Sequence, residues 1–307
     1  MQPVPAEVAR AGLRALYTVA IADGEVSPLE RAFIEAVREH VLHADAAPDE
    51  PITADELAAL VPPGEARQRI LGGAVLASTI DGRTTEDEIA VLDGFARALG
   101  VDLAPVRTAR RLAREHLALA RFDIARRSLP GHKIKQTIRE DGVLALIEQL
   151  WPTLGGHDDA LTARYRALEA YPAGTLGRAY FDFVTSNGFD FPGQPHAGPE
   201  MIVVHDCLHV LGGYGTSPGE EIDVSAFQAG CHGGDPFYGI LFGLAQYHLG
   251  VRVTPVAAAE KLHADPARMV AAFARGAKVN RDMWSDFRPW DHFAKPLDEL
   301  RRELNVG

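Results

Sequence analysis

The chain has 307 residues, of which 47% are hydrophobic, so it is long enough for one large domain or two ordinary domains with buried cores. Its net charge of -11 argues against a nucleic-acid-binding protein. Its two cysteines, Cys207 and Cys231, argue against a disulfide scaffold, and no secretion signal or membrane-spanning stretch is recognisable, so we expect a soluble, cytoplasmic protein.

The first hundred residues contain an internal repeat of helix, Asp-Gly turn and helix. Segment 22–30, ADGEVSPLE, recurs in outline as segment 80–88, IDGRTTEDE. In each copy an apolar helix is expected to end at the Asp-Gly pair. A capping residue, Ser27 or Thr85, with a glutamate three residues later then begins the next helix. The pattern predicts two helical hairpins.

This repeat resembles the tellurite-resistance TerB-like domain over about residues 8–101. The resemblance implies an acidic, all-helical module, to which we assign residues 1–104. Neither copy supplies the alternating oxygen ligands of an EF-hand. A cation held between the hairpins is an alternative, although helix capping explains the acidic residues more simply; these are Asp23, Glu30, Asp81 and Glu88. The proline-rich stretch 47–66 cannot form one regular element and is expected to connect the two halves.

A basic segment follows the acidic repeat. Residues 1–100 contain 8 Lys and Arg against 17 Asp and Glu, whereas residues 107–139 contain 10 against 2. The simpler interpretation is a solvated helix face that docks on its acidic neighbour. The alternative is an anionic membrane surface, which would place the protein peripherally at the inner face of the membrane.

Helical periodicity continues to the end of the chain, and strand signals are almost absent. Helices are expected from Val143 to Trp151, from Leu161 to Ala170 and from Phe237 to Leu249. The sequence therefore predicts an all-α fold of two helical domains. The second domain covers residues 105–307 and includes a basic connecting segment, 105–140.

The segment HDCLH, residues 205–209, indicates a metal site. On a helix, His205 and His209 lie about 40° apart, Asp206 lies about 60° from His209, and Cys207 faces away. Apolar residues on both sides suggest a buried helix, in which imidazole and carboxylate must be paired or bind an ion. A glycine-rich stretch then ends the helix and returns the chain to Glu220 and Glu221.

Two histidines with carboxylates suit zinc or ferrous iron better than magnesium or calcium. Asp206 could be a ligand or, as in the related H-E-x-x-H pattern, a general base. In a purely structural alternative, His205 and Asp206 form a hydrogen-bonded core pair and the glutamates are solvated.

The full spacing, H-D-x-x-H-x(11)-E, resembles the motif of the coenzyme Q biosynthesis protein 4 family, and the resemblance covers about residues 125–307. Other stretches agree with that family in order: GTLGRAY at 174–180, Phe183, NGF at 187–189, Trp284, Trp290 and KPLDELR at 295–301. Two features differ. Leu208 replaces a residue that is commonly aromatic, and segment 230–235 is unusually polar and rich in glycine.

This resemblance implies a zinc or iron site at His205, Asp206, His209 and Glu221. It implies a role in making ubiquinone or a related prenylquinone, with a prenylated quinone precursor or other isoprenoid lipid as ligand and other quinone-biosynthesis proteins as partners. The implied reaction is oxidative removal of a ring carboxylate with hydroxylation at the same carbon. Candidates for moving protons are Glu220, Asp223 and His232, each of which could equally be an ordinary loop residue.

Two other classes of function stay open. One is a prenyl-lipid-binding scaffold without catalysis, and the other is a hydrolase whose metal activates water. The apolar stretch 236–249 could shelter an isoprenoid tail, although a helix that is apolar nearly all round is usually part of the core.

Overall fold

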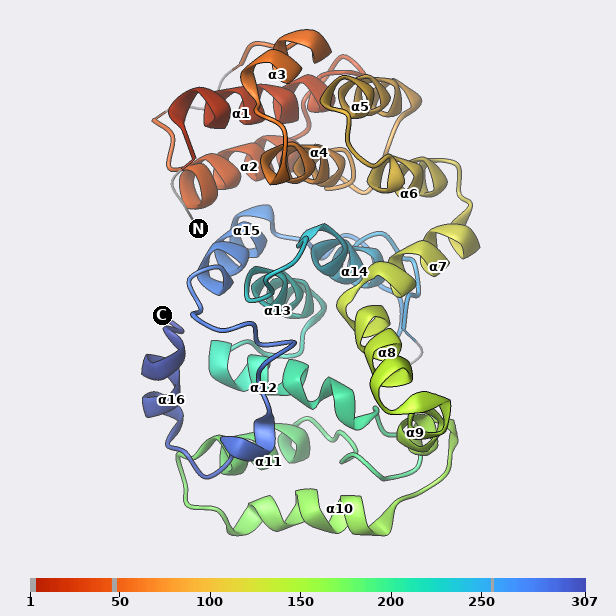
Figure 1. Ribbon diagram of the computed structural model, residues 1–307, viewed down its shortest axis with the longest axis vertical. Coiled ribbons are helices and arrows are strands. Elements are labelled where there is room, and N and C mark those ends of the chain that lie inside the picture. The colour runs from red at the N-terminus through yellow and green to blue at the C-terminus, as the bar shows by residue number, and fades with distance from the viewer. Residues whose placement is uncertain (1–3, 46–48, 255–256) are drawn as a thin grey trace.

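The computed structural model describes residues 4–45, 49–254 and 257–307, and within these ranges it contains 16 α-helices and no β-strand. The predicted all-α fold is therefore confirmed. Figure 1 shows helices α1 to α6 at one end of the molecule and helices α7 to α16 below them. In this described part of the chain, no helix is long and apolar enough to cross a membrane.

The upper layer contains the predicted repeat. Both capping boxes are present, Ser27 with Glu30 at the start of α2 and Thr85 with Glu88 at the start of α5. The elements of this layer are α1 (Ala6–Ala20), α2 (Pro28–Ala36), the π-helical turn η1 (Val37–Leu42), α3 (Ala54–Leu60), α4 (Glu65–Ala77), α5 (Glu86–Leu99) and α6 (Ala104–Ala113).

The proline-rich connection contains one short helix, α3, which Thr53 caps at its start. Residues 47 and 48, the first two of the predicted connection, lie outside the described residues. The stretch is thus not one regular element, as expected.

The basic face of α6 packs on acidic residues of the repeat. Arg110 forms an ion pair with Asp93, and Arg114 lies 2.8 Å from Glu86. The simpler interpretation of the basic segment, docking on the acidic neighbour, is confirmed for these two arginines.

The lower part contains the three helices predicted in it, as α9, as α10 with η3, and as α14. Its elements are α7 (Leu117–Arg127), α8 (Leu129–Glu140), α9 (Gly142–Leu150), η2 (Pro152–Leu154), α10 (Asp159–Arg166), η3 (Ala167–Ala170), α11 (Leu176–Ser186), η4 (Glu200–Ile202), α12 (Val203–Gly212), α13 (Pro218–Gly230), α14 (Phe237–Tyr247), α15 (Pro266–Gly276), η5 (Pro289–Asp291) and α16 (Leu297–Leu304).

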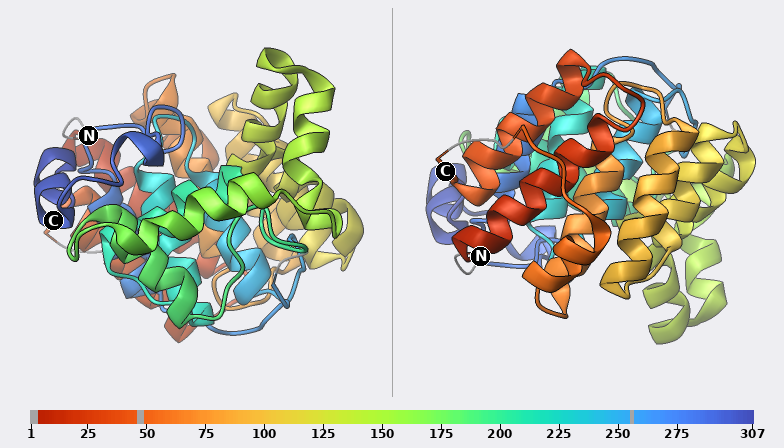
Figure 2. Two further views of the ribbon diagram at one scale, coloured as in Figure 1. Left: turned by 90° about the horizontal axis from the view of Figure 1, so that it is seen from below. Right: turned by 90° about the horizontal axis from the view of Figure 1, so that it is seen from above.

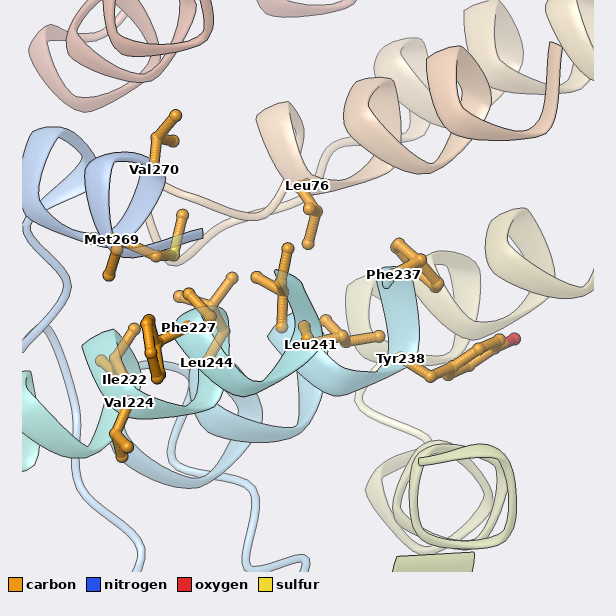
Figure 3. Packing of buried hydrophobic residues seen from close by; sticks show 14 of the residues in the cluster. Leu76, Ile222, Val224, Phe227, Phe237, Tyr238, Leu241, Leu244, Met269 and Val270 are labelled. Carbon is orange, nitrogen blue, oxygen red and sulfur yellow. The ribbon is translucent and has the colours of Figure 1, made fainter. Parts of the chain in front are cut away.

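The buried side chains of α13, α14 and α15 meet those of α4 in one apolar cluster. Figure 3 shows Leu76 of α4 pointing toward α14, whereas Met269 of α15 points toward Phe227 of α13. A Cβ atom at Gly72 would lie 3.3 Å from the Cβ atom of Phe237, so α4 and α14 are in close contact. The division into two domains at residue 104 stays a prediction.

Glu88 offers a test of the repeat through the pH dependence of stability. Burial, together with the nearby charges of Glu30 and Asp81, raises the pKa of Glu88 to about 8. The hydrogen bonds from Thr85 act in the opposite direction and lower it. In the unfolded chain the same carboxyl group titrates near 4.5. Because the folded state binds this proton more tightly, the contribution of Glu88 to stability is complete below pH 4.5 and is lost as the pH rises through about 8.

We therefore expect Glu88→Gln to be as stable as wild type in acid and to become more stable than wild type as the pH rises. Above about pH 8, its melting temperature should exceed that of wild type by at least about 2 °C. The control is Asp87→Asn, an exposed neighbour on the same turn. The melting temperatures of all three proteins are measured across this pH range. If the melting temperatures of both variants changed with pH as that of wild type does, the interpretation would be contradicted.

Candidate metal centre

Helices α12 and α13 and the turn between them assemble the predicted motif. Helix α12 ends at Gly212 and is capped by Gly213, whose φ of 73° is left-handed and therefore suits glycine. The turn then leads to Ser217, which forms a capping box with Glu220 and begins α13. Glu221 lies in the first turn of α13 and thereby faces the end of α12.

The side chains of His205, His209 and Glu221 converge, and their ligand atoms all lie within 4.8 Å of one another. The Nε2 atoms of the two histidines are 3.2 Å apart. The carboxylate of Glu221 lies 3.5 Å from His205 Nε2 and 3.6 Å from His209 Nε2. His209 is fully enclosed, whereas a quarter of the His205 side chain is exposed, so the group is reachable from one side.

The other ring nitrogens of both histidines are held by acceptors. His209 Nδ1 lies 2.9 Å from the carbonyl oxygen of Gly215, and His205 Nδ1 lies 3.0 Å from Oε1 of Gln228. Because each of these oxygens accepts, each Nδ1 carries the proton and each Nε2 presents a lone pair. Two lone pairs facing each other repel unless a proton or a metal ion lies between them, so the donor set fits a metal ion.

The ionisation of the three groups agrees with this arrangement. Although burial lowers it, the hydrogen bond and charge of Glu221 raise the pKa of His205 to about 9. Burial and the charge of His205 lower the pKa of His209 to about 4. Against the effect of burial, the two histidines hold the pKa of Glu221 below its ordinary value. In the absence of a metal, one proton on His205 therefore occupies the position that a cation would take.

Asp206, the fourth predicted ligand, is not part of the converging group. It lies on α12 about 100° around the helix from His205. Burial, together with the charge of Glu221, raises the pKa of Asp206 to about 7. The charge of His205 acts in the opposite direction. Burial raises the pKa of Tyr180 on α11 well above its ordinary value, and the charge of Asp206 raises it further. The role of Asp206 as a ligand or base stays a prediction.

Of the predicted proton-moving residues, Glu220 and Asp223 have structural partners. Glu220 accepts hydrogen bonds from the Ser217 hydroxyl, at 2.6 Å, and from the Gly215 backbone NH, at 3.1 Å. It thus holds the turn whose carbonyl oxygen orients His209. Asp223 is buried in an ion pair with Arg268 of α15. Burial raises the pKa of Asp223 to about 6, while Arg268 lowers it.

His232 lies beyond the other end of α13, roughly 16 Å from Glu221 along the helix axis. Its Nδ1 atom lies 2.9 Å from Asp282, which also accepts from the backbone NH of Gly233. His232 lines a cavity of about 340 Å³ at this end of the helix. An apolar cavity of about 140 Å³ lies between α2, α4, α14 and α15. Neither cavity is lined by His205, His209 or Glu221.

Three residues that support the histidines were not singled out as site residues from the motif. Gln228 and Gly215 provide the acceptors described above, and the ring of Phe183 from α11 stacks on His209 with ring centres 5.2 Å apart. Gln228 follows Glu221 by seven residues, which places both on one face of α13. That spacing was a signal for Gln228; no comparable local signal exists for Gly215.

Gln228 provides a test of the support around the histidines. Replacing Gln228 with leucine leaves the Nδ1 proton of His205 without its acceptor, and we expect metal affinity to fall about 10- to 100-fold. Gln228→Glu retains an acceptor oxygen and should stay much closer to wild type. Competition with a chromophoric chelator measures both constants, and unchanged affinity in the leucine variant would contradict this role.

No protein-family model matches the chain, and a search of curated proteins finds no significant match.

Proposed function

We propose that this chain is a metal-dependent protein of ubiquinone or related prenylquinone biosynthesis that oxidatively decarboxylates and hydroxylates a prenylated aromatic ring. The observation that supports the proposal most is the arrangement of His205, His209 and Glu221, with both Nδ1 atoms held by acceptors. The likeness of the motif and its flanking segments to the coenzyme Q biosynthesis protein 4 family supports the substrate class.

Two histidines and one carboxylate leave coordination positions free. This donor set is typical of ferrous iron in oxygenases, and it also occurs with zinc in hydrolases. Zinc has no redox chemistry, so the oxidative reaction requires iron. When bound, ferrous iron would supply a reducing centre for dioxygen and an open position for an oxygen atom of the substrate.

The reaction balances with dioxygen and a two-electron reductant. The bond between the ring and its carboxylate breaks and releases carbon dioxide, and one oxygen atom of dioxygen forms the new ring hydroxyl group. Two electrons and two protons reduce the other oxygen atom to water, and a third proton completes the hydroxyl group. Around this step, Gly215 and Gln228 would orient the imidazoles, and Asp206 would hold or release a proton beside them.

The test uses protein loaded anaerobically with ferrous iron or zinc and a prenylated hydroxybenzoate labelled in its carboxylate carbon. We expect labelled carbon dioxide from the iron-loaded protein when dioxygen and reductant are added. We expect none with zinc, without dioxygen or with His209→Ala. If the protein co-purifies with isoprenoid lipid but releases no label, the scaffold alternative holds. Water-dependent cleavage of an ester or amide substrate with zinc would favour the hydrolase instead.

A further inference from the structure

The cavity beyond the end of α13 has the size and lining of a small-molecule site. Its volume of about 340 Å³ is within the range of ligand pockets and is more than twice the roughly 150 Å³ that accommodates benzene. Apolar side chains and glycines form most of its wall, and the apolar side chains include Ala229, Pro236, Phe273, Ala277 and Val279. Ligand pockets usually combine such a wall with a few polar groups that orient the ligand.

The cavity lies where the upper layer meets the lower helices. Arg69 of α4 contributes to its wall, whereas the other lining residues come from α13, α15 and the segments that follow these two helices. Seen from above in Figure 2, the red and orange helices of the upper layer lie over the teal and blue helices of the lower part. A ligand in this cavity would therefore contact both parts of the chain.

His232 provides a polar group on the wall, and Asp282 fixes its orientation. Asp282 Oδ2 lies 2.9 Å from His232 Nδ1 and accepts from the backbone NH of Gly233 at 3.0 Å. Asp282 Oδ1 accepts from the backbone NH groups of Trp284 and Ser285, each at 2.9 Å. Although burial raises it, these hydrogen bonds hold the pKa of Asp282 well below its ordinary value. An ionised carboxylate only accepts, so the Nδ1 atom of His232 carries a proton.

The Nε2 atom of neutral His232 therefore presents a lone pair. Among the described residues, only Asp282 forms a hydrogen bond with this ring, so Nε2 is free to accept. The other polar side chains of the wall have partners of their own, which are Glu65 for Arg69, the carbonyl oxygen of Glu303 for Asn280, and His292 for Arg281. A hydrogen-bond donor is therefore the group that this wall lacks.

Gly234 keeps the space beside this lone pair open. A Cβ atom at Gly234 would lie 2.7 Å from His232 Nε2, so a larger residue would displace the ring or cover the nitrogen. The φ angle of Gly234 is not left-handed, so its backbone does not require glycine. A Cβ atom at the neighbouring Gly233 would make only an ordinary contact, 3.5 Å from Asp282. The glycine at position 234 thus serves access to Nε2.

We propose that this cavity binds a small apolar molecule through a hydroxyl group that donates to Nε2 of His232. A hydroxyl group supplies the missing donor without the desolvation cost that an ammonium group would bring to a mostly apolar wall. The volume leaves room for an aromatic ring, and Phe273 provides an aromatic neighbour for it, so phenols are the class that we expect. The inference goes beyond the proposed function, because no ligand of the candidate metal centre lines this cavity.

Fluorine NMR on the full chain at about pH 8 tests the proposal. The probes are 4-fluorophenol and 4-fluorotoluene, which are close in shape and differ in the hydroxyl group. We expect the phenol to bind at least about tenfold more tightly, because the toluene covers Nε2 without giving it a partner. A third probe, 4-fluorobenzoate, has a carboxylate that only accepts, and it should bind more weakly than the phenol.

Two variants locate the contact. Gly234→Ala and His232→Leu should each lower affinity for 4-fluorophenol about tenfold. Gly233→Ala is the matched control for the first, and His209→Ala separates this cavity from the metal centre; both should bind the phenol as wild type does. The proposal is overturned if the phenol does not bind, or if the toluene or the benzoate binds as tightly. It is also overturned if Gly234→Ala or His232→Leu keeps wild-type affinity, or if His209→Ala loses it.

Discussion

His209→Ala is expected to lower affinity for zinc and ferrous iron by more than about 100-fold, beyond the range seen for the loss of a residue that only supports a ligand. His209 is fully enclosed, and its Nε2 lies 3.2 Å from His205 Nε2 and 3.6 Å from Glu221. Alanine removes one of the three converging donors. Elemental analysis and chelator competition on purified protein measure the effect.

The matched control is His157→Ala, which removes an exposed histidine between η2 and α10. It should bind metal as wild type does. Metal should also raise the melting temperature of wild type and of the control, because it binds the folded state, and should leave that of His209→Ala unchanged. Equal metal content in wild type and His209→Ala would show that the three side chains do not form a metal site.

The converging residues could be predicted because most of their geometry is local. A separation of four residues places His205 and His209 on one helix face wherever that helix lies. The glycines after the helix indicate its end and a return of the chain. The spacing to Glu221 came from the family motif. Asp206 was predicted as a ligand because it lies about 60° from His209 on the helix and belongs to the family motif, yet it lies about 100° from His205 and is not in the converging group.

The candidates for moving protons show that closeness in sequence does not decide whether a side chain reaches the metal centre. Glu221 and Asp223 are two residues apart, which places them about 200° apart around α13. Asp223 therefore faces Arg268 of α15 rather than α12. His232 lies beyond the far end of α13, where it lines a cavity. Their environments depend on which helices pack around α13, and no local pattern encodes that packing.

The fold divides in the same way between local and distant determinants. Capping boxes and Asp-Gly turns involve neighbouring residues, so the helical hairpins of the repeat could be predicted. The apolar stretches at α9 and α14 look alike in sequence, but α14 is largely buried while α9 has no buried residue. Periodicity reveals a helix and its apolar face, and only the tertiary arrangement decides whether another helix covers that face.

The contact between α13 and α15 depends on glycine, and it fixes the helix that carries Glu221 and Gln228. A Cβ atom at Gly276 would overlap the carbonyl oxygen of Phe227, and one at Gly230 would overlap that of Phe273. In each case the obstacle is backbone, which cannot rotate away as a side chain could. Replacing either glycine must therefore separate the two helices.

Gly276→Ala is accordingly expected to destabilise the protein by about 3 kcal/mol, at the upper end of the usual cost of overpacking, and to lower the melting temperature by roughly 6 °C or more. Gly94→Ala on α5 is the control, because open space surrounds its Cβ position. There alanine should stabilise the helix by up to about 1 kcal/mol. Chemical denaturation measures the free energy of unfolding of both variants. If the helix contact is as described, this free energy falls for Gly276→Ala and rises for Gly94→Ala. A Gly276→Ala protein as stable as Gly94→Ala would mean that α13 and α15 do not approach this closely.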